Sequence, residues 1–351
     1  MPSSFDFAGL GLWGNVAIFV VSAIVIWLAG SRLTIYADIV ADRTGLGRAF
    51  VGIVLLAVVT SLPEIARTIT ASIQQRTEVV IDSLFGGMVL LMAVLAMADW
   101  LVARKHVLTF FAPTPVLLLQ GAMLILLLAI SLAGAAVGEV FSLFGVGFWV
   151  TVILGVYLVS LVQMRSYESR EPWRPTQVPE EIKLAFAVEG GNHQNRGLRW
   201  TLFLIFVTSI IVFITGILVT QSGIALAEEA GLGTGFVGAT LLAFAAALPE
   251  TSVTFTAVRL GAYSLAISNI LGTNAFLVAL LFLGDVFYPA PLLNTTSSAA
   301  MFAMAAAVLT TAIYLIGMLE RRNRAFIGMG LDSLAVLITY CITLVVLYSL
   351  G

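Results

Sequence analysis

The feature that most constrains this chain is a proline and a glutamate inside an apolar stretch long enough to cross a membrane. The pentapeptide TSLPE (residues 60–64) lies within the apolar run 49–73. A carboxylate at the centre of a membrane helix costs about 2.5–3.5 kcal/mol on insertion scales, so Glu64 needs a polar cavity or a partner. Because Pro63 has no backbone N–H, the carbonyl of Val59 loses its helical hydrogen bond and the helix must bend or break there.

The groups around this break are hard oxygen ligands. Freed carbonyls, the Glu64 carboxylate and the hydroxyls of Thr60 and Ser61 are the donor types that Ca²⁺ and Na⁺ prefer. The pattern therefore indicates a cation site. The plainer alternative is a proline kink whose glutamate is paired with a neighbouring side chain.

The same feature occurs twice in the chain. A shift of 186 residues, the separation of Glu64 and Glu250, aligns residues 45–64 with residues 231–250 without a gap. Twelve of these twenty positions are identical, and both Leu-Pro-Glu triplets are among them. The chain is therefore expected to be an internal duplication that carries its acidic site twice. A kink kept only for packing would not need its carboxylate in both copies.

Composition places the chain in a lipid bilayer. Of its 351 residues, 60% are hydrophobic and 10% are charged, and the mean hydropathy is +1.07. A polytopic membrane protein is therefore expected. No basic segment precedes the first apolar stretch, so no cleavable signal peptide is expected.

Several other functional classes find no support in the sequence. The single cysteine, Cys341, excludes a disulfide framework, and the two histidines, His106 and His193, lie in polar connections. No Walker loop supports ATP-driven pumping, and no nucleophile–base pair supports an enzyme. No cofactor and no nucleic-acid partner are expected.

Ten apolar segments are long enough to span a membrane, five on each side of a polar stretch. The fold class expected is an all-α membrane protein. Its domains would be a first five-helix repeat at 1–164, a cytoplasmic linker at 165–199 and a second five-helix repeat at 200–351. The predicted spans are 13–33, 49–74, 79–98, 113–134, 140–163, 200–226, 233–258, 263–284, 297–317 and 325–350.

Charge placement predicts the orientation of these spans. Apart from Arg67 and Arg76, every lysine and arginine falls in the loops after the odd-numbered spans. The positive-inside rule puts those loops in the cytoplasm and both termini outside, in the cell (inner) membrane. Since an odd number of spans separates the copies, they would form inverted repeats with broken helices 2 and 7. Glu64 and Glu250 would then approach each other, and two such carboxylates repel unless a cation or proton lies between them.

The remaining acidic residues near span ends are interpreted more simply. Asp99, Glu139 and Asp285 are expected to be solvated, and Asp332 is expected at the interface or facing a cavity.

Together, the TSLPE motif, its LPE twin, the segment SNILGTN (residues 268–274) and the five-plus-five plan resemble the sodium/calcium exchanger family. This family belongs to the cation/Ca²⁺ antiporter superfamily, and the chain looks like a divergent member of it. The resemblance implies that Glu64 and Glu250 coordinate Ca²⁺ at the centre of the protein. It also implies accessory oxygens from the Thr-Ser pair before each LPE and from polar residues of the following helix.

Carried over position by position, Thr60 and Ser61 match the family in the first copy, and Thr273 and Asn274 match in the second. Thr68 and Thr254 lie one turn after each glutamate on its own helical face, so their hydroxyls are further accessory candidates. Other family positions have lost their side-chain oxygens; they are occupied by Ala246, Ala247, Gly87, Met88, Leu91 and Leu277.

Arg67 is a further departure, three residues after Glu64 on the same helical face. Three interpretations stand side by side. Arg67 neutralises Glu64 and leaves no room for a divalent ion, or it substitutes for a bound cation during the cycle. In the third, it pairs with Asp82 and leaves Glu64 free.

The function expected is a secondary active antiporter that exchanges Ca²⁺ against Na⁺ or H⁺ by alternating access. The lost oxygens favour H⁺, because a carboxylate carries a proton without extra ligands. The alternative is a membrane protein that kept the exchanger fold, lost ion exchange and acts as a structural or regulatory partner. The sequence gives no oligomeric state.

Overall fold

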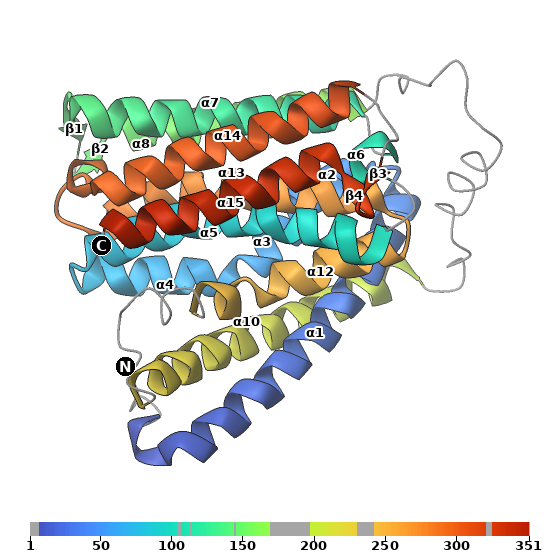
Figure 1. Ribbon diagram of the computed structural model, residues 1–351, viewed down its shortest axis with the longest axis horizontal. Coiled ribbons are helices and arrows are strands. Elements are labelled where there is room, and N and C mark those ends of the chain that lie inside the picture. Colours follow the sequence, from blue (N-terminus) through green and yellow to red (C-terminus); the bar gives the residue numbers. More distant parts are fainter. Residues whose placement is uncertain are drawn as a thin grey trace.

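A computed structural model shows an almost entirely helical chain (Figure 1). The structure describes residues 7–103, 107–111, 114–143, 145–168, 197–229, 242–320 and 325–350. Its only strands within these residues form two antiparallel hairpins, each made of two-residue strands. The all-α fold class predicted from the sequence is therefore confirmed.

The elements follow the apolar segments closely. Those of the first half are η1 (Ala8–Leu10), α1 (Gly11–Thr44), α2 (Arg48–Val51), the π-helix η2 (Gly52–Leu56), α3 (Ala57–Thr60), α4 (Leu62–Ile73), α5 (Thr77–Ala98), the π-helix η3 (Asp99–Ala103), α6 (Leu108–Phe111), α7 (Pro115–Val137), β1 (Ser142–Leu143), β2 (Val146–Gly147) and α8 (Phe148–Glu168). Those of the second half are α10 (Leu198–Glu229), α12 (Leu248–Arg259), α13 (Tyr263–Phe287), η4 (Leu292–Thr295), α14 (Ser298–Glu320), β3 (Ala325–Phe326), β4 (Met329–Gly330) and α15 (Leu331–Leu350).

Many of these helices can cross a bilayer. Eight described helices are long and apolar enough to do so, and one further pair, Arg48–Thr60 and Leu62–Ile73, forms a span bent by 49°. The predicted seventh span, 233–258, lies partly outside the described residues. The chain is a multi-pass integral membrane protein.

The two longest helices, α1 and α10, lie along one edge of the helix bundle. Figure 1 shows α1 and α10 side by side along one edge of the molecule, inclined to the remaining stack. In that stack α5 and α13 occupy the interior, since most of their side chains are buried, whereas α8 and α15 expose apolar faces. Exposed apolar side chains on outer helices are what a lipid solvent requires.

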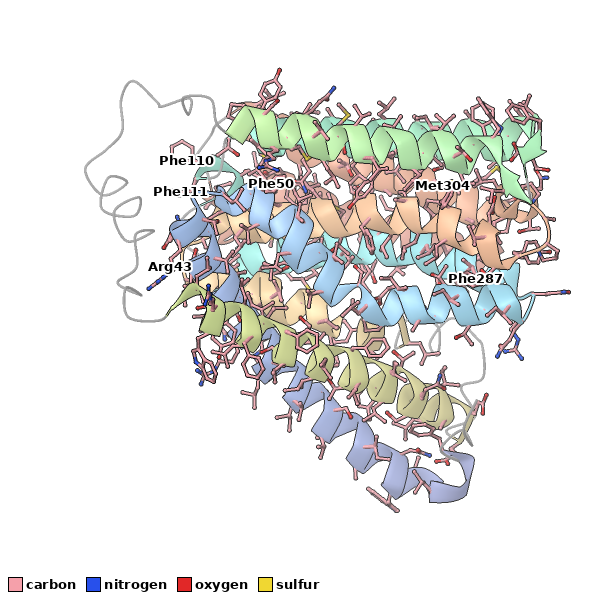
Figure 2. The ribbon with its side chains drawn as sticks, turned by 180° about the vertical axis from the view of Figure 1, so that it is seen from behind. Arg43, Phe50, Phe110, Phe111, Phe287 and Met304 are labelled. Carbon is pink, nitrogen blue, oxygen red and sulfur yellow. The ribbon has the colours of Figure 1, made fainter. Side chains whose placement is uncertain are left out.

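The two ends of the helix bundle can be told apart in the figures. Arg43, Phe110 and Phe111 lie at one end and Phe287 at the other (Figure 2). The start of α1 and the end of α15 share one end (Figure 1).

Two acidic side chains expected to be solvated are buried instead. Asp99 is 0% exposed and Asp285 is 1% exposed. The prediction of solvated span ends is wrong for both, because backbone N–H groups replace water around each carboxylate. Glu139 remains partly exposed.

These two buried carboxylates connect the halves of the chain. Asp99 Oδ1 accepts from Leu108 N and Asp99 Oδ2 from Gly330 N, both at 2.9 Å. Asp285 Oδ1 accepts from Leu292 N at 2.8 Å and Asp285 Oδ2 from Gly147 N at 2.9 Å. Asp99 and Asp285 are themselves 186 residues apart. Each carboxylate therefore binds its own following loop and the hairpin before the last helix of the other half.

Candidate cation site

The two Leu-Pro-Glu triplets begin helices of the same length and geometry. Helix α4 starts at Leu62 after Ser61 (φ −86°, ψ 8°), and α12 starts at Leu248 after Ala247 (φ −81°, ψ 2°). Both helices have 12 residues, with the proline at their second position, where its missing N–H costs least. The break predicted before Pro63 is present. Residues 242–246 are helical, so the second motif is also interrupted, at Ala247.

The two glutamates are buried and close enough to interact. Glu64 is 7% exposed and Glu250 is 2% exposed. The Glu64 carboxylate and the Thr60 hydroxyl both lie near enough to act on the Glu250 carboxylate. Both oxygens of Glu250 and Oε2 of Glu64 are buried without a hydrogen-bond partner in the described part of the chain. A native structure rarely leaves buried carboxylate oxygens unpaired unless something else binds them.

The predicted hydroxyl ligands are all buried, with different partners. Ser61 Oγ is unpartnered among the described residues. Thr60 Oγ1 donates to the carbonyl of Leu56 at 3.0 Å, which leaves its lone pairs available to a cation. Thr254 is 0% exposed and accepts a hydrogen bond from Asn269. Thr68 is 2% exposed, one turn beyond Glu64.

Helix α13 supplies amide and hydroxyl oxygens from its buried middle. Thr273 and Asn274 are buried, and Thr273 Oγ1 and Asn274 Oδ1 are unpartnered within the described residues. Asn274 Nδ2 donates to the carbonyl of Met88 in α5 at 3.3 Å, which fixes which way the amide points. Asn274 therefore connects α13 to α5 by its nitrogen and keeps its oxygen free for a ligand.

Asn269 was not among the predicted site residues. Its side chain is 0% exposed, its Nδ2 donates to Thr254 Oγ1 at 3.3 Å, and its Oδ1 is buried and unpartnered in the described structure. It occupies the second position of the SNILGTN segment, one helical turn before Thr273. Its place in that segment could have identified it as a candidate ligand. The contact with α12 through Thr254 is visible only in the structure.

Gln120 of α7 is a second polar residue that sequence reasoning missed. It is 0% exposed, its Nε2 donates to the carbonyl of Ser268 at 2.9 Å, and its Oε1 has no partner in the part of the chain described. Ser268 in turn packs against Gly52, where a Cβ atom would overlap Ser268 Oγ. Gln120 therefore links α7 to α13 by a hydrogen bond next to the π-helix η2. Helices of this type are frequent at functional sites.

The positions where the family resemblance calls for further oxygens are apolar and packed. Met88 is 0% exposed, and Leu91 and Leu277 are each 3% exposed. Their side chains carry no oxygen that could coordinate an ion. The candidate site therefore consists of two carboxylates and a limited set of neutral oxygens. No cluster of three or more His, Cys, Asp or Glu side chains occurs in the described residues.

Among the described residues, Arg67 is the basic side chain that acts on both glutamates. It is half-buried in α4 and acts electrostatically on Glu64 and Glu250. Across the described residues no direct ion pair joins it to Glu64, unlike Arg48, whose Nε lies 2.6 Å from Asp38 Oδ1. Asp82, the other partner predicted for Arg67, accepts a hydrogen bond from Ser297 Oγ at 3.0 Å.

Solved structures of an exchanger have the same fold. The sodium-calcium exchanger NCX_Mj soaked with 100 mM Na⁺ and 10 mM Sr²⁺ gives a TM-score of 0.69 at 18% identity, covering 94% of this chain and 97% of that chain. The same exchanger in 10 mM Na⁺ and zero Ca²⁺ gives 0.68 at 17% identity, covering 94% and 98%. At this identity the likeness shows the fold alone. A search of curated proteins gives no match.

The sequence profile of one family matches both halves of the chain. The profile, described as sodium/calcium exchanger protein, matches residues 14–164 and again residues 199–349. Members of this family are transporters, not enzymes, and they exchange cations. The two matches cover most of the chain, so this protein belongs to the sodium/calcium exchanger family.

Proposed function

We propose that this protein is a secondary active antiporter that exchanges Ca²⁺ against Na⁺ or H⁺ by alternating access. The observation that carries the proposal is the pair of buried glutamates, one at each helix break, with three carboxylate oxygens left unpartnered among the described residues. A divalent cation between them would satisfy these oxygens and cancel their mutual repulsion.

Glu64 and Glu250 are the central ligands in this proposal. The accessory oxygens come from Thr60, Ser61, Thr68, Thr254, Thr273 and Asn274. Because Ca²⁺ takes about 6–8 oxygens, two carboxylates need help from neutral groups, carbonyls or water. The unpartnered Ser61 Oγ, Thr273 Oγ1 and Asn274 Oδ1 support this arrangement.

The proposed architecture is two inverted five-helix repeats, at 1–164 and 200–351, joined by a cytoplasmic linker at 165–199. The repeated match at 14–164 and 199–349 supports the division. The charge distribution supports a cell (inner) membrane location with both termini outside. Alternating access would then expose the glutamate pair first to one side of the membrane and then to the other.

The test is Ca²⁺ flux into proteoliposomes under an imposed Na⁺ or pH gradient, for the wild type and for Glu250→Gln. Glutamine keeps the shape but removes the charge, so flux should fall to the level of empty liposomes. Helical content and thermal stability serve as the control for folding. Unchanged flux in a folded Glu250→Gln protein would reject the site.

The counter-ion is tested in the same vesicles. The apolar residues Leu91 and Leu277 occupy positions where further Na⁺ ligands are expected, which disfavours several Na⁺ ions and leaves a single Na⁺ or protons as the counter-ion. If protons drive the exchange, Ca²⁺ flux should respond to a pH gradient in Na⁺-free buffer. Flux that is silent without Na⁺ and restored by Na⁺ would reject the proton version.

A second candidate is an exchanger-fold protein that no longer moves ions and serves as a structural or regulatory partner. Two features favour it: the positive charge of Arg67 acts on the glutamates, and the side chains of Met88 and Leu91 carry no oxygen ligand. The unpartnered glutamate oxygens oppose it. Calorimetry separates the two, since this candidate predicts no Ca²⁺ binding that depends on Glu250.

A further inference from the structure

The glutamate pair shares its electrostatic environment with one fixed positive charge. Arg67 acts on both carboxylates, and within the described residues no third acidic side chain joins the group. With both glutamates ionised, as cation binding requires, two negative charges and one guanidinium leave a net charge of minus one. A guanidinium is never deprotonated in proteins, so this count does not depend on pH.

The helix geometry holds Arg67 on the side of the glutamates. Glu64 and Arg67 are three residues apart in the continuous helix α4, which places their side chains on neighbouring positions of one face. Arg67 is half-buried, so its charge is only partly screened by solvent. With no direct ion pair to Glu64 in the described structure, the guanidinium acts through space and leaves carboxylate oxygen for an ion.

In the second repeat, the position equivalent to Arg67 carries no charge. The residue equivalent to Arg67 is Val253, in the helix α12 that has the same length and the same Leu-Pro-Glu start. Val253 is 0% exposed, so an aliphatic side chain fits this helical environment. The charge at Arg67 is therefore not needed to form the helix.

The charge count sets the number of monovalent ions that the site needs. When Ca²⁺ leaves, a pair of bare carboxylates needs two monovalent cations to reach neutrality. Because Arg67 supplies one positive charge, one monovalent cation is enough.

We propose that Arg67 acts as a tethered cation, so that a single Na⁺, rather than two, balances the glutamate pair in the Ca²⁺-free state. This inference rests on the proposed function, since it requires that Glu64 and Glu250 bind cations. Arg67 is then the residue that sets how many monovalent ions the site takes. It also competes with Ca²⁺ for the same carboxylates.

The experiment is a calorimetric titration of the purified full-length protein with Ca²⁺ at a series of Na⁺ concentrations. The slope of log apparent Kd for Ca²⁺ against log Na⁺ concentration gives the number of Na⁺ ions displaced. The wild type should give a slope of about one at high Na⁺. Arg67→Val, which copies the second repeat, should give a steeper slope, towards two. In Na⁺-free buffer the same variant should bind Ca²⁺ about tenfold more tightly, because a like charge has been removed.

Two further variants keep the test decisive. Arg67→Lys retains the charge and should keep the wild-type slope. Arg67→Gln removes the charge but keeps a polar side chain at this half-buried position, and it should behave as Arg67→Val even if valine harms folding. A wild-type slope of two or of zero, or equal slopes in the wild type and both neutral variants, would overturn the proposal.

Failure of the inference can be told apart from failure of the proposed function. Glu250→Gln is titrated alongside and should lose Ca²⁺ binding. If Glu250→Gln binds Ca²⁺ like the wild type, the glutamate site itself is wrong. If Glu250→Gln loses binding while the Arg67 variants keep the wild-type slope, only the tethered-cation role is wrong.

Discussion

At the scale of single residues, the site is defined by oxygens that protein groups leave unsatisfied. A buried polar atom without a partner costs about 1–3 kcal/mol, so a cluster of them is a strong sign of a missing ligand. Glu64, Glu250, Ser61, Thr273 and Asn274 each contribute such an atom among the described residues. A proline kink kept only for packing gives no reason for this clustering.

Asn269 provides a residue-scale prediction. Its unpartnered Oδ1 makes it a further ligand, because its Nδ2 is already engaged with Thr254. Asn269→Ala should lower Ca²⁺ affinity by about tenfold, the loss of roughly one charge-assisted contact, measured by calorimetry. The control is Ser72→Ala, which removes another buried, unpartnered hydroxyl two turns beyond Glu64 on α4 and should leave affinity unchanged. Equal affinities in Asn269→Ala and the wild type would remove Asn269 from the site.

At the scale of secondary-structure elements, the buried carboxylates of Asp99 and Asp285 hold the hairpins of the opposite half. Each makes two hydrogen bonds to backbone N–H groups, one local and one across the halves. Hairpins with two-residue strands have little stability of their own. The carboxylates therefore position the starts of α8 and α15 against α13 and α5.

This role predicts a loss of stability at Asp285. Asp285→Ala would leave the N–H groups of Gly147 and Leu292 without their acceptor, at about 1–3 kcal/mol each. The melting temperature in detergent should fall clearly, whereas Asp285→Asn, which keeps one acceptor oxygen, should fall less. Asp82→Asn, at an exposed position of α5, is the control. Equal melting temperatures for Asp285→Ala and the wild type would contradict the role.

The sequence predicted most of the helices but not the contacts that their polar side chains make. The lengths of the apolar segments predicted the eight or nine spans that the structure describes, and the missing N–H of Pro63 predicted the break. Both follow from local properties of the sequence. The solvated interpretation of Asp99 and Asp285 was wrong, because their N–H partners come from distant hairpins that no local pattern reveals. The contacts of Asn269 and Gln120 are equally non-local. The predicted ligand set stays a prediction, since an ion's coordination depends on distances that sequence does not give.

At the scale of the whole molecule, the two halves hold each other's broken helices. In α10, Gly216 packs against Pro63 of the first motif, where a Cβ atom would lie 2.5 Å from Pro63 Cγ. In α1, Gly30 packs against Ser252 in the second motif helix, where a Cβ atom would overlap Ser252 Oγ. Gly30 and Gly216 are themselves 186 residues apart. The helices α1 and α10, which lie along one edge in Figure 1, therefore pack against the glutamate helices of the opposite half through equivalent glycines.

This reciprocal packing gives the last prediction, which concerns transport. We expect the proposed alternating access to shift α10 relative to the site. The proline ring at Pro63 cannot move aside for an added methyl group as a flexible side chain could. Gly216→Ala should therefore slow Ca²⁺ exchange in proteoliposomes several-fold, while Ca²⁺ affinity changes little, because no ligand is touched. Gly155→Ala is the matched control, since a Cβ atom at Gly155 of α8 meets nothing within 4 Å. Exchange rates that stay equal in both variants would show that α10 does not move against the Pro63 break during the cycle. A loss of Ca²⁺ affinity in Gly216→Ala would instead mean that this contact shapes the site itself.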